Sequence, residues 1–213
     1  MPDADAPANP LLVSTRNAHK VGEIRAILGP GFLVSDLTSA PAVPEIEETG
    51  DTFEENATLK AVAASLHFDG WVIADDSGLE VDALGGAPGV RSARYAGEQS
   101  NDAANNALLL RNLLPFHGPE RSARFRCVIA LARNGQKLAA FSGAVEGTII
   151  DSPRGQGGFG YDPLFVPDGH RETFAQLGAG IKNGLSHRAR ALHALKTGPM
   201  PSHVKTTKSE RDR

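Results

Sequence analysis

Two adjacent carboxylates, Asp75 and Asp76, follow the short apolar run Trp71–Ala74. The run predicts a buried strand, and the two acids are expected at its carboxyl end, beside a turn at Ser77-Gly78. An uncompensated buried charge is strongly unfavourable, so each acid must be hydrated, paired or bound to a cation. If strand geometry persists, one side chain points toward a cleft and the other points away. The alternative for this pair alone is a solvated loop acid or a helix cap.

A second acidic pair, Glu47 and Glu48, precedes a helix predicted from Thr52 onward, where Glu55 completes a capping box. Acidic residues near a helix start are common for dipole reasons alone. As a metal ligand the candidate is one of the two glutamates, because adjacent side chains tend to point apart. One Glu and one Asp suffice for Mg²⁺, which keeps several waters while it bridges substrate phosphates.

Two lysines suited to phosphate accompany these acids. Lys60 lies in the predicted helix, and Lys20 ends the segment 15–20, where a predicted strand at residues 10–14 passes into a helix. A helix N-terminus presents unpaired amides to anions, and Thr15 and Asn17 add side-chain donors, so a phosphate can dock there. Read alone, this segment more often indicates a capped helix start.

Two later segments offer candidate nucleotide contacts. The Gly-rich residues 155–163 allow backbone to approach a ligand closely, with Phe159 as a stacking face for a base. The alternative there is a strand-connecting turn with buried aromatics. Residues 182–188 open the last predicted helix, where His187 and Arg188 provide donors for a keto oxygen or a phosphate. A helix start with exposed polar residues is the alternative.

The bulk composition excludes several kinds of site. The chain has 213 residues, a formal net charge of -3 and a single cysteine, Cys127. The charge balance argues against binding to duplex nucleic acid, and one thiol permits neither an intrachain disulfide nor a thiolate metal cluster. The histidines show no zinc-ligand spacing. Without a membrane-length apolar run or a signal-like start, we expect a cytoplasmic protein with no membrane partner.

Strands and helices alternate first and a long hairpin follows. This order predicts an α/β fold: a mixed twisted β-sheet flanked by helices, with a long β-hairpin at residues 122–132 and 137–150 around Asn134-Gly135. Further helices are expected at residues 101–114 and 186–195. Residues 10–195 are expected to form a single domain, between a flexible leader at 1–9 and a disordered tail at 196–213.

Taken together, these segments resemble the inosine triphosphate pyrophosphatase (ITPase) family, the noncanonical purine NTP (XTP/dITP) diphosphatases. The matching segments occur in family order: Ser14–Asn17 with Lys20, Glu47–Gly50 and Thr52–Ala57 with Lys60, Ala74–Leu79 with Val81–Leu84, Gly86–Gly89 with Ser92–Gly97, Gly157–Pro163, and Lys182 with Ser186–Arg188. The resemblance implies an ITPase-like fold and a homodimer that uses Mg²⁺. It also implies hydrolysis of dITP, ITP or XTP to the monophosphate and pyrophosphate.

The resemblance also implies roles for individual residues. Asp76 matches the general base and a metal contact, and Glu48, or Glu47 in its place, joins in metal binding. The residues implied to bind the nucleotide are Thr15, Arg16, Asn17, Ala18, His19, Lys20, Lys60, Ser77, Phe159, Gly160, Tyr161, Asp162, Lys182, His187 and Arg188. Among them, residues 15–20 and Lys60 would hold the triphosphate and Phe159 would face the base.

Two departures from the family pattern stand out. Arg16 occupies a position where Gly is frequent, and Gly178–Ile181 replaces an acidic, helix-favouring stretch before Lys182. Two rival functions stay open: a related pyrophosphatase for pyrimidine or modified nucleotides, and a nucleotide-binding module without turnover. The residues leave open the preference among dITP, ITP and XTP, the exclusion of guanine, the number of metal ions and the dimer geometry.

Overall fold

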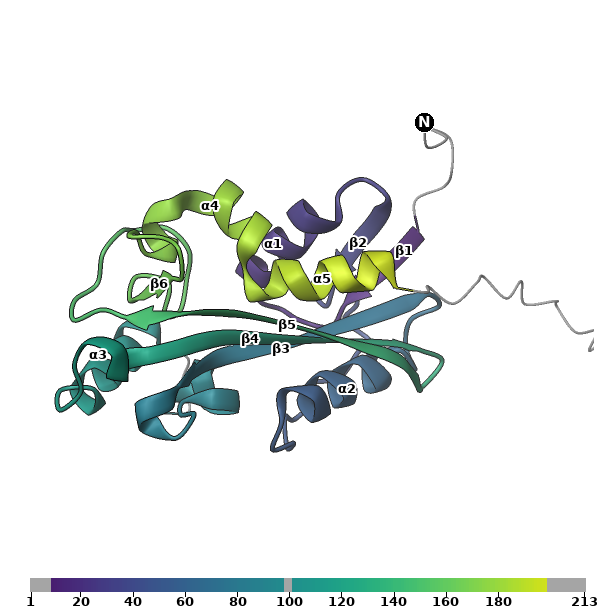
Figure 1. Cartoon of the computed structure of the whole chain (residues 1–213). Helices are drawn as coiled ribbons and strands as arrows, with labels where there is room; N and C mark the ends of the chain where they lie inside the picture. Colours follow the sequence, from purple (N-terminus) through teal and green to yellow (C-terminus); the bar gives the residue numbers. More distant parts are fainter. Residues whose placement is uncertain (1–8, 98–100, 199–213) are drawn as a thin grey trace, which may run out of the picture.

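The computed structural model, which describes residues 9–97 and 101–198, is built around one mixed sheet (Figure 1). Its six strands follow the order β2-β1-β3-β4-β5-β6. Their bounds are β1 Asn9–Val13, β2 Phe32–Asp36, β3 Trp71–Val81, β4 Ser122–Arg133, β5 Gln136–Ile149 and β6 Phe165–Pro167. Strands β1, β2 and β3 are parallel, whereas β3 to β6 pair antiparallel. The predicted mixed α/β sheet and its long β4–β5 hairpin are therefore confirmed.

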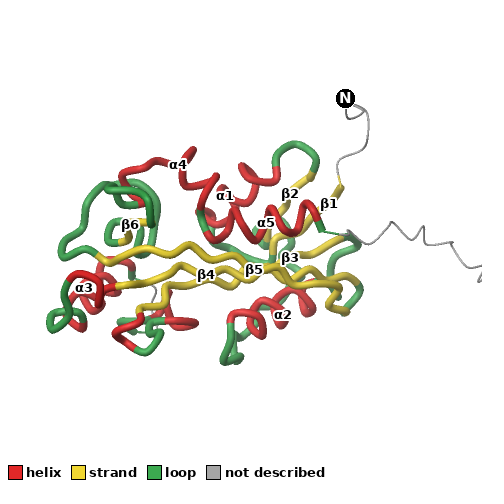
Figure 2. The backbone as a smooth tube through the Cα atoms, viewed as in Figure 1, coloured by secondary structure: helices red, strands yellow, loops and turns green. Residues whose placement is uncertain are grey.

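Helices cover both faces of this sheet (Figures 1 and 2). The α-helices are α1 Ala18–Leu28, α2 Phe53–Ala64, α3 Asp102–Asn112, α4 Phe174–Leu185 and α5 His187–Thr197, and short 3₁₀ helices span Asp82–Leu84, Gly89–Arg94 and Gly118–Arg121. Helices α1, α4 and α5 lie on one face and α2 on the other. The capping box predicted at the start of α2 is present, since Thr52 and Glu55 bond each other's backbone.

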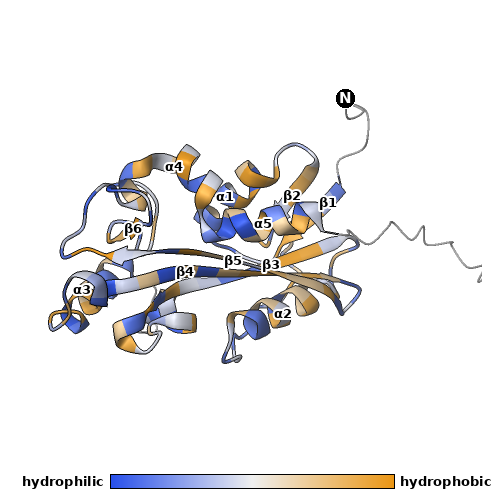
Figure 3. Ribbon diagram, in the orientation of Figure 1, coloured by the Kyte–Doolittle hydropathy of each residue, from blue (hydrophilic) through white to orange (hydrophobic). Residues whose placement is uncertain are grey.

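Hydrophobic residues recur along the strands and the helices that cover them (Figure 3), and the two faces of the sheet bury different side chains. Toward α1 and α5 the core is built from large aliphatic residues, among them Ile73, Ile129 and Leu192. Toward α2 it is built mainly from alanines, including Ala57 and Ala74, which let the helix pack closely on the strands. Each fully buried Leu or Ile side chain contributes about 1.5–3 kcal/mol to folding.

The order in which strands are added to the sheet changes direction between β1 and β3. From β1 the chain passes through α1 to β2 on one side, then returns through α2, over the opposite face, to β3. Such a topological switch leaves a crevice outside the carboxyl ends of the strands, where open α/β sheets bind their ligands. Strand β1 ends at Val13, and its pairing with β3 covers only Trp71 to Ile73. Strand β3 continues beyond this pairing, with one edge facing the crevice.

The turn predicted at Ser77-Gly78 is wrong, because β3 runs without interruption from Trp71 to Val81 and pairs with β4 over nearly its whole length. Close packing, rather than a turn, explains the glycine. A Cβ on Gly78 would lie 2.4 Å from the Gly89 carbonyl oxygen and 2.4 Å from Ser92 Oγ. The two aspartates therefore lie in the middle of a strand.

Some boundaries differ from the expectations. Strand β1 already includes Asn9, and α5 continues to Thr197, so the predicted leader and tail each overlap an element at one end. The remainder of both segments, residues 1–8 and 199–213, lies outside the described residues. Helix α4 was not predicted, because its three glycines conceal a helical pattern. Every helix in the described ranges is too short or too polar to traverse a membrane.

Candidate active site

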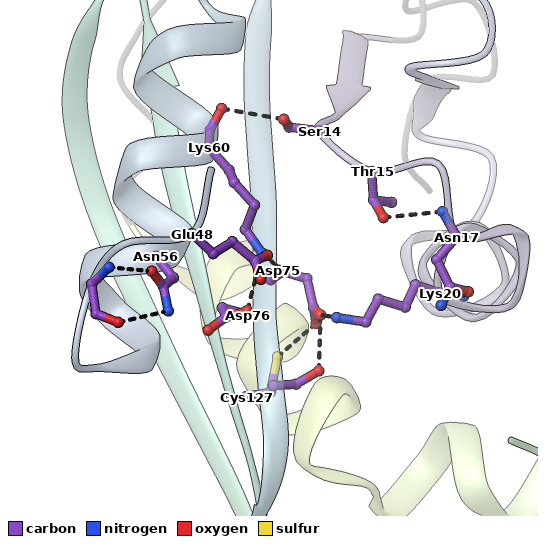
Figure 4. A network of polar contacts seen from close by, with 12 residues as sticks. Ser14, Thr15, Asn17, Lys20, Glu48, Asn56, Lys60, Asp75, Asp76 and Cys127 are labelled. Carbon is purple, nitrogen blue, oxygen red and sulfur yellow. Dashed lines mark hydrogen bonds and ion pairs between the residues drawn. The ribbon is translucent and has the colours of Figure 1, made fainter. Parts of the chain in front are cut away.

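Asp75 is a fully buried carboxylate on the face of β3 that packs against α1 and α5. Four side chains contact it: Lys20 Nζ at 2.5 Å, Arg188 Nε at 2.9 Å, Ser77 Oγ at 3.0 Å and Cys127 Sγ at 3.0 Å. Burial alone would raise the pKa of Asp75, but the Arg188 guanidinium and the Lys20 ammonium hold it well below its usual range. This carboxylate therefore stays ionised. It ties Lys20 of α1, seen in Figure 4, to Arg188 of α5.

Asp76 points to the opposite face, toward α2, where Lys60 joins it to Glu48 (Figure 4). Lys60 Nζ donates to Glu48 Oε1 at 2.5 Å, to Asp76 Oδ1 at 3.0 Å and to the Asp75 carbonyl at 2.9 Å. Two carboxylates from separate segments thus lie within reach of one cation. Asp76 Oδ2 is buried and has no hydrogen-bond partner in the described part of the chain.

The pKa values of these acids move in opposite directions. Burial raises the pKa of Asp76, with Lys60 opposing the shift. Burial would also raise the pKa of Glu48, but the Lys60 ammonium outweighs it and lowers that pKa. Asp76 is therefore the better proton acceptor of the two, because its raised pKa makes the carboxylate more basic.

The loop that carries Glu48 is held by the first turn of α2. The buried Asn56 side chain accepts from Gly50 N at 2.8 Å and donates to Gly50 O at 3.2 Å. Glu48 is turned inward, where Arg94 Nη2 also contacts it at 3.2 Å, whereas Glu47 is exposed. Of the two glutamates left open by the sequence, Glu48 is the one that faces Asp76.

Helix α1 begins with the cap that the sequence suggested as an alternative. Asn17 Oδ1 accepts from the amides of His19 and Lys20 at 3.0 and 3.1 Å, and Thr15 Oγ1 accepts from Asn17 N at 3.1 Å. The cap occupies amides that a phosphate would otherwise bind. Arg16 and Ala18 are exposed at the same end of the helix.

A cavity opens between α1, β3, β4 and the starts of α3 and α5. Ten predicted nucleotide-binding residues line it: Asn17, Lys20, Ser77, Phe159, Gly160, Tyr161, Asp162, Lys182, His187 and Arg188. The other predicted residues, Thr15, Arg16, Ala18, His19 and Lys60, lie outside its wall, as do Glu48 and Asp76. Lys20 connects the two regions, because its charge contributes to the lowered pKa of Glu48 and opposes the rise in the pKa of Asp76.

The aromatic ring of Phe159 contacts the ammonium group of Lys182 and the ring of His19. Lys182 Nζ lies 4.6 Å from the centre of its ring, and the His19 ring stacks on it at 5.5 Å with an angle of 20°. Asp162 Oδ2 accepts from Lys182 Nζ at 2.5 Å and from Phe159 N at 2.9 Å, which orients the loop. An aromatic face beside ammonium groups suits a planar, electron-rich base.

His187 is buried in the wall of the same cavity. Burial lowers its pKa well below the usual value, and the neighbouring Arg188 guanidinium adds to the shift. Its ring stacks on Phe125 at 4.9 Å, and its Nδ1 has no partner within the described residues. The start of α5 reaches this position because Gly143 on β5 has no side chain; a Cβ there would lie 2.2 Å from the His187 carbonyl oxygen. His187 is therefore neutral at physiological pH.

Four residues of this region were missed by the sequence reasoning: Glu23, Asp102, Phe125 and Cys127. Glu23 contacts Lys182 and Arg188, and Asp102 accepts from Gly160 N at 2.6 Å. Glu23 could have been predicted from the sequence, because it lies three residues after Lys20 and therefore on the same side of α1. Phe125 and Cys127 reach the site only through strand pairing, which no local pattern reveals.

The fold and the site define an α/β protein with a cation-lined crevice at its topological switch point. The family model described as "Ham1 family" matches residues 11–198, and the chain belongs to that family. It is 51% identical over 188 residues to the dITP/XTP pyrophosphatase of Shouchella clausii, covering 88% of this chain and 95% of that relative. The dITP/XTP pyrophosphatase of Geobacter sulfurreducens is 54% identical over 187 residues, 87% of this chain and 94% of the relative.

Solved structures agree with this assignment. A HAM1 protein from Coxiella burnetii superposes with a TM-score of 0.80 at 41% identity, covering 89% of this chain and 97% of that one. The expected ITPase-like fold and family membership are thereby confirmed.

Proposed function

We propose that this protein hydrolyses dITP, ITP and XTP to the monophosphate and pyrophosphate, and so removes these purines from the nucleotide pool. The observation that carries the proposal is the meeting of Glu48, Lys60 and Asp76 beside a cation-lined cavity. The dITP/XTP pyrophosphatases that are 51% and 54% identical to this chain support it. A homodimer, as the resemblance implies, is part of the proposal.

The acidic pair fits Mg²⁺. Asp76 Oδ2 is a buried oxygen without a partner among the described residues, Glu48 supplies a second hard oxygen, and Lys60 Nζ already lies between them as a cation. The described residues contain no group of three or more His, Cys, Asp or Glu that could hold a metal. Two carboxylates suffice for Mg²⁺, which retains waters and, when bound, neutralises charge on phosphoryl oxygens.

Asp76 acts as the general base. It takes a proton from a water molecule whose oxygen attacks the α-phosphorus, and the bond to the oxygen that bridges to the β-phosphate breaks. Pyrophosphate leaves with that oxygen, and the monophosphate remains. Lys20 and Lys60 stabilise the charge that develops on the phosphoryl oxygens. A positioned base typically contributes about 10²–10⁴-fold to the rate.

The cavity selects the base. Phe159 offers the stacking face, while His187, Lys182 and Arg188 offer donors to a 6-keto oxygen. The 6-amino group of adenine would set donor against donor, which a site built for a keto oxygen rejects strongly.

The test is a panel of dITP, XTP, dATP, dGTP and dTTP with Mg²⁺ and detection of released pyrophosphate. We expect fastest turnover of dITP and XTP, and at least about a hundredfold loss in Asp76→Asn. Release of orthophosphate, or fastest turnover of dTTP, would contradict the proposal. Near-normal turnover by Asp76→Asn would remove Asp76 from its role as the base.

A further inference from the structure

Glu23, on α1, joins two cations that line the base end of the cavity. Its Oε1 lies 2.8 Å from Lys182 Nζ, and its Oε2 accepts from Arg188 Nη1. The Glu23 side chain is only 14% exposed, and those of Lys182 and Arg188 are 5% and 1% exposed. The three side chains come from α1, α4 and α5, so this carboxylate links all the helices on one face of the sheet.

Lys182 and Arg188 each have a second carboxylate partner besides Glu23. Lys182 Nζ donates to Asp162 Oδ2 at 2.5 Å, and Arg188 forms a two-pronged contact with Asp75 at 2.9 and 3.3 Å. Asp162 thus holds Lys182 and Asp75 holds Arg188, whereas Glu23 holds both. The distance between the two cationic groups depends on Glu23 more directly than on either aspartate.

The donors of these cations are almost all engaged. Arg188 Nη2 also donates to Ser77 Oγ at 2.9 Å, so its contacts with Asp75, Ser77 and Glu23 use all but one of the guanidinium N–H groups. The ion pairs of Lys182 with Asp162 and Glu23 leave one ammonium N–H. Among the described residues, each cation therefore retains a single donor for a ligand, with the others fixed by carboxylates and by Ser77.

We propose that Glu23 is a positioning residue for base discrimination, which aims the remaining donors of Lys182 and Arg188 at a keto oxygen of the purine. The inference rests on the proposed function and names a determinant of its specificity. Without this carboxylate, two buried cations lose a shared counter-charge, and both long side chains regain rotamer freedom. Their donors then meet a keto oxygen less often, while contacts to the triphosphate, which other residues make, are unaffected.

The experiment compares Glu23→Gln with the wild type on two substrates: dITP, and the triphosphate of purine deoxyriboside, which lacks the 6-keto oxygen. We expect kcat/KM for dITP to fall about tenfold, mainly through KM, because an amide NH₂ group would face one of the cations. The analogue without the keto group should change less than about threefold. The preference for dITP therefore narrows in the variant.

A matched control is Glu54→Gln, which removes an exposed ion pair with Lys137, 2.6 Å long, and should leave both substrates unchanged. Equal losses on the two substrates, or no loss on either, would overturn the proposal, because Glu23 would then only brace the helices. Wild-type protein that releases no pyrophosphate from dITP would instead refute the proposed function. If Glu23→Gln does not fold, as judged by circular dichroism, Glu23→Asp applies the same test, since its shorter side chain cannot reach both cations.

Discussion

Asp75 and Asp76 are neighbours in the chain, but their carboxylates lie on opposite faces of β3 and contact different lysines, Lys20 and Lys60. The two side chains point apart because successive side chains of a strand lie on opposite faces of the sheet. Both aspartates can serve one crevice because β1 ends early and leaves the edge of β3 open. One acid holds the cavity wall together, and the other, on the proposed mechanism, does the chemistry.

The structural role of Asp75 gives a prediction about stability. Asp75→Asn removes the carboxylate that pairs with the partly buried Lys20 and one of the two carboxylates that pair with the buried Arg188, and we expect the free energy of unfolding at pH 7 to fall by about 3 kcal/mol. The measurement is urea unfolding in the presence of EDTA. A loss below about 1 kcal/mol would show that the remaining partners compensate.

The same variant predicts a pH dependence. Because the pKa of Asp75 is well below normal in the folded protein, its contribution is fully present above the unfolded pKa of about 4. It is lost as the pH falls through the lowered folded value, so the stability difference between wild type and Asp75→Asn should shrink below pH about 4. A difference that stays constant down to acidic pH would contradict the lowered pKa.

Local patterns predicted the elements whose signals are local. The cap at Thr52 and the turn at Asn134-Gly135 each fix an element boundary through neighbouring residues, and each is present. The turn predicted at Ser77-Gly78 is wrong because the dipeptide favours a turn only locally. In the protein, pairing of β3 with β4 holds both residues in the strand.

The site was predictable only in part. The residues that line the cavity were named through the resemblance, but the ion pairs of Glu23 link α1 to helices more than 150 residues away in the chain. No spacing rule reveals such contacts. The choice between Glu47 and Glu48 also depends on tertiary structure, since Asn56 and Lys60 orient the loop.

Substitution of each of the two adjacent glutamates tests which of them binds the metal. On the proposed mechanism, Glu48→Gln should raise the Mg²⁺ concentration for half-maximal pyrophosphate release by at least about tenfold, because a neutral amide replaces a charged ligand. Glu47→Gln, one residue away and exposed, should leave it unchanged. A shift confined to Glu47→Gln, or equal shifts in both, would exclude Glu48 as the specific ligand.

Two glycines of α4 provide another matched pair. Gly178 has φ 77° and ψ 162°, a conformation nearly restricted to glycine, so Gly178→Ala should lower the free energy of unfolding by about 1–3 kcal/mol. Gly180 has ordinary helical backbone and open space around its Cα, so Gly180→Ala should raise it by up to about 1 kcal/mol. Thermal or urea unfolding of the two variants measures both effects. Equal destabilisation would mean that the break at Gly178 is not required.

His187 gives the final prediction, on base selection. Because burial and Arg188 keep its pKa well below the ordinary value, the ring stays neutral, and the preference for dITP over dATP should be constant from pH 6 to pH 8. His187→Ala removes one donor that faces the cavity and should narrow that preference by roughly tenfold. The measurement is the ratio of kcat/KM for the two nucleotides across that pH range. A ratio that rises as the pH falls toward 6 would instead mean that His187 takes up a proton and recognises the base as a cation.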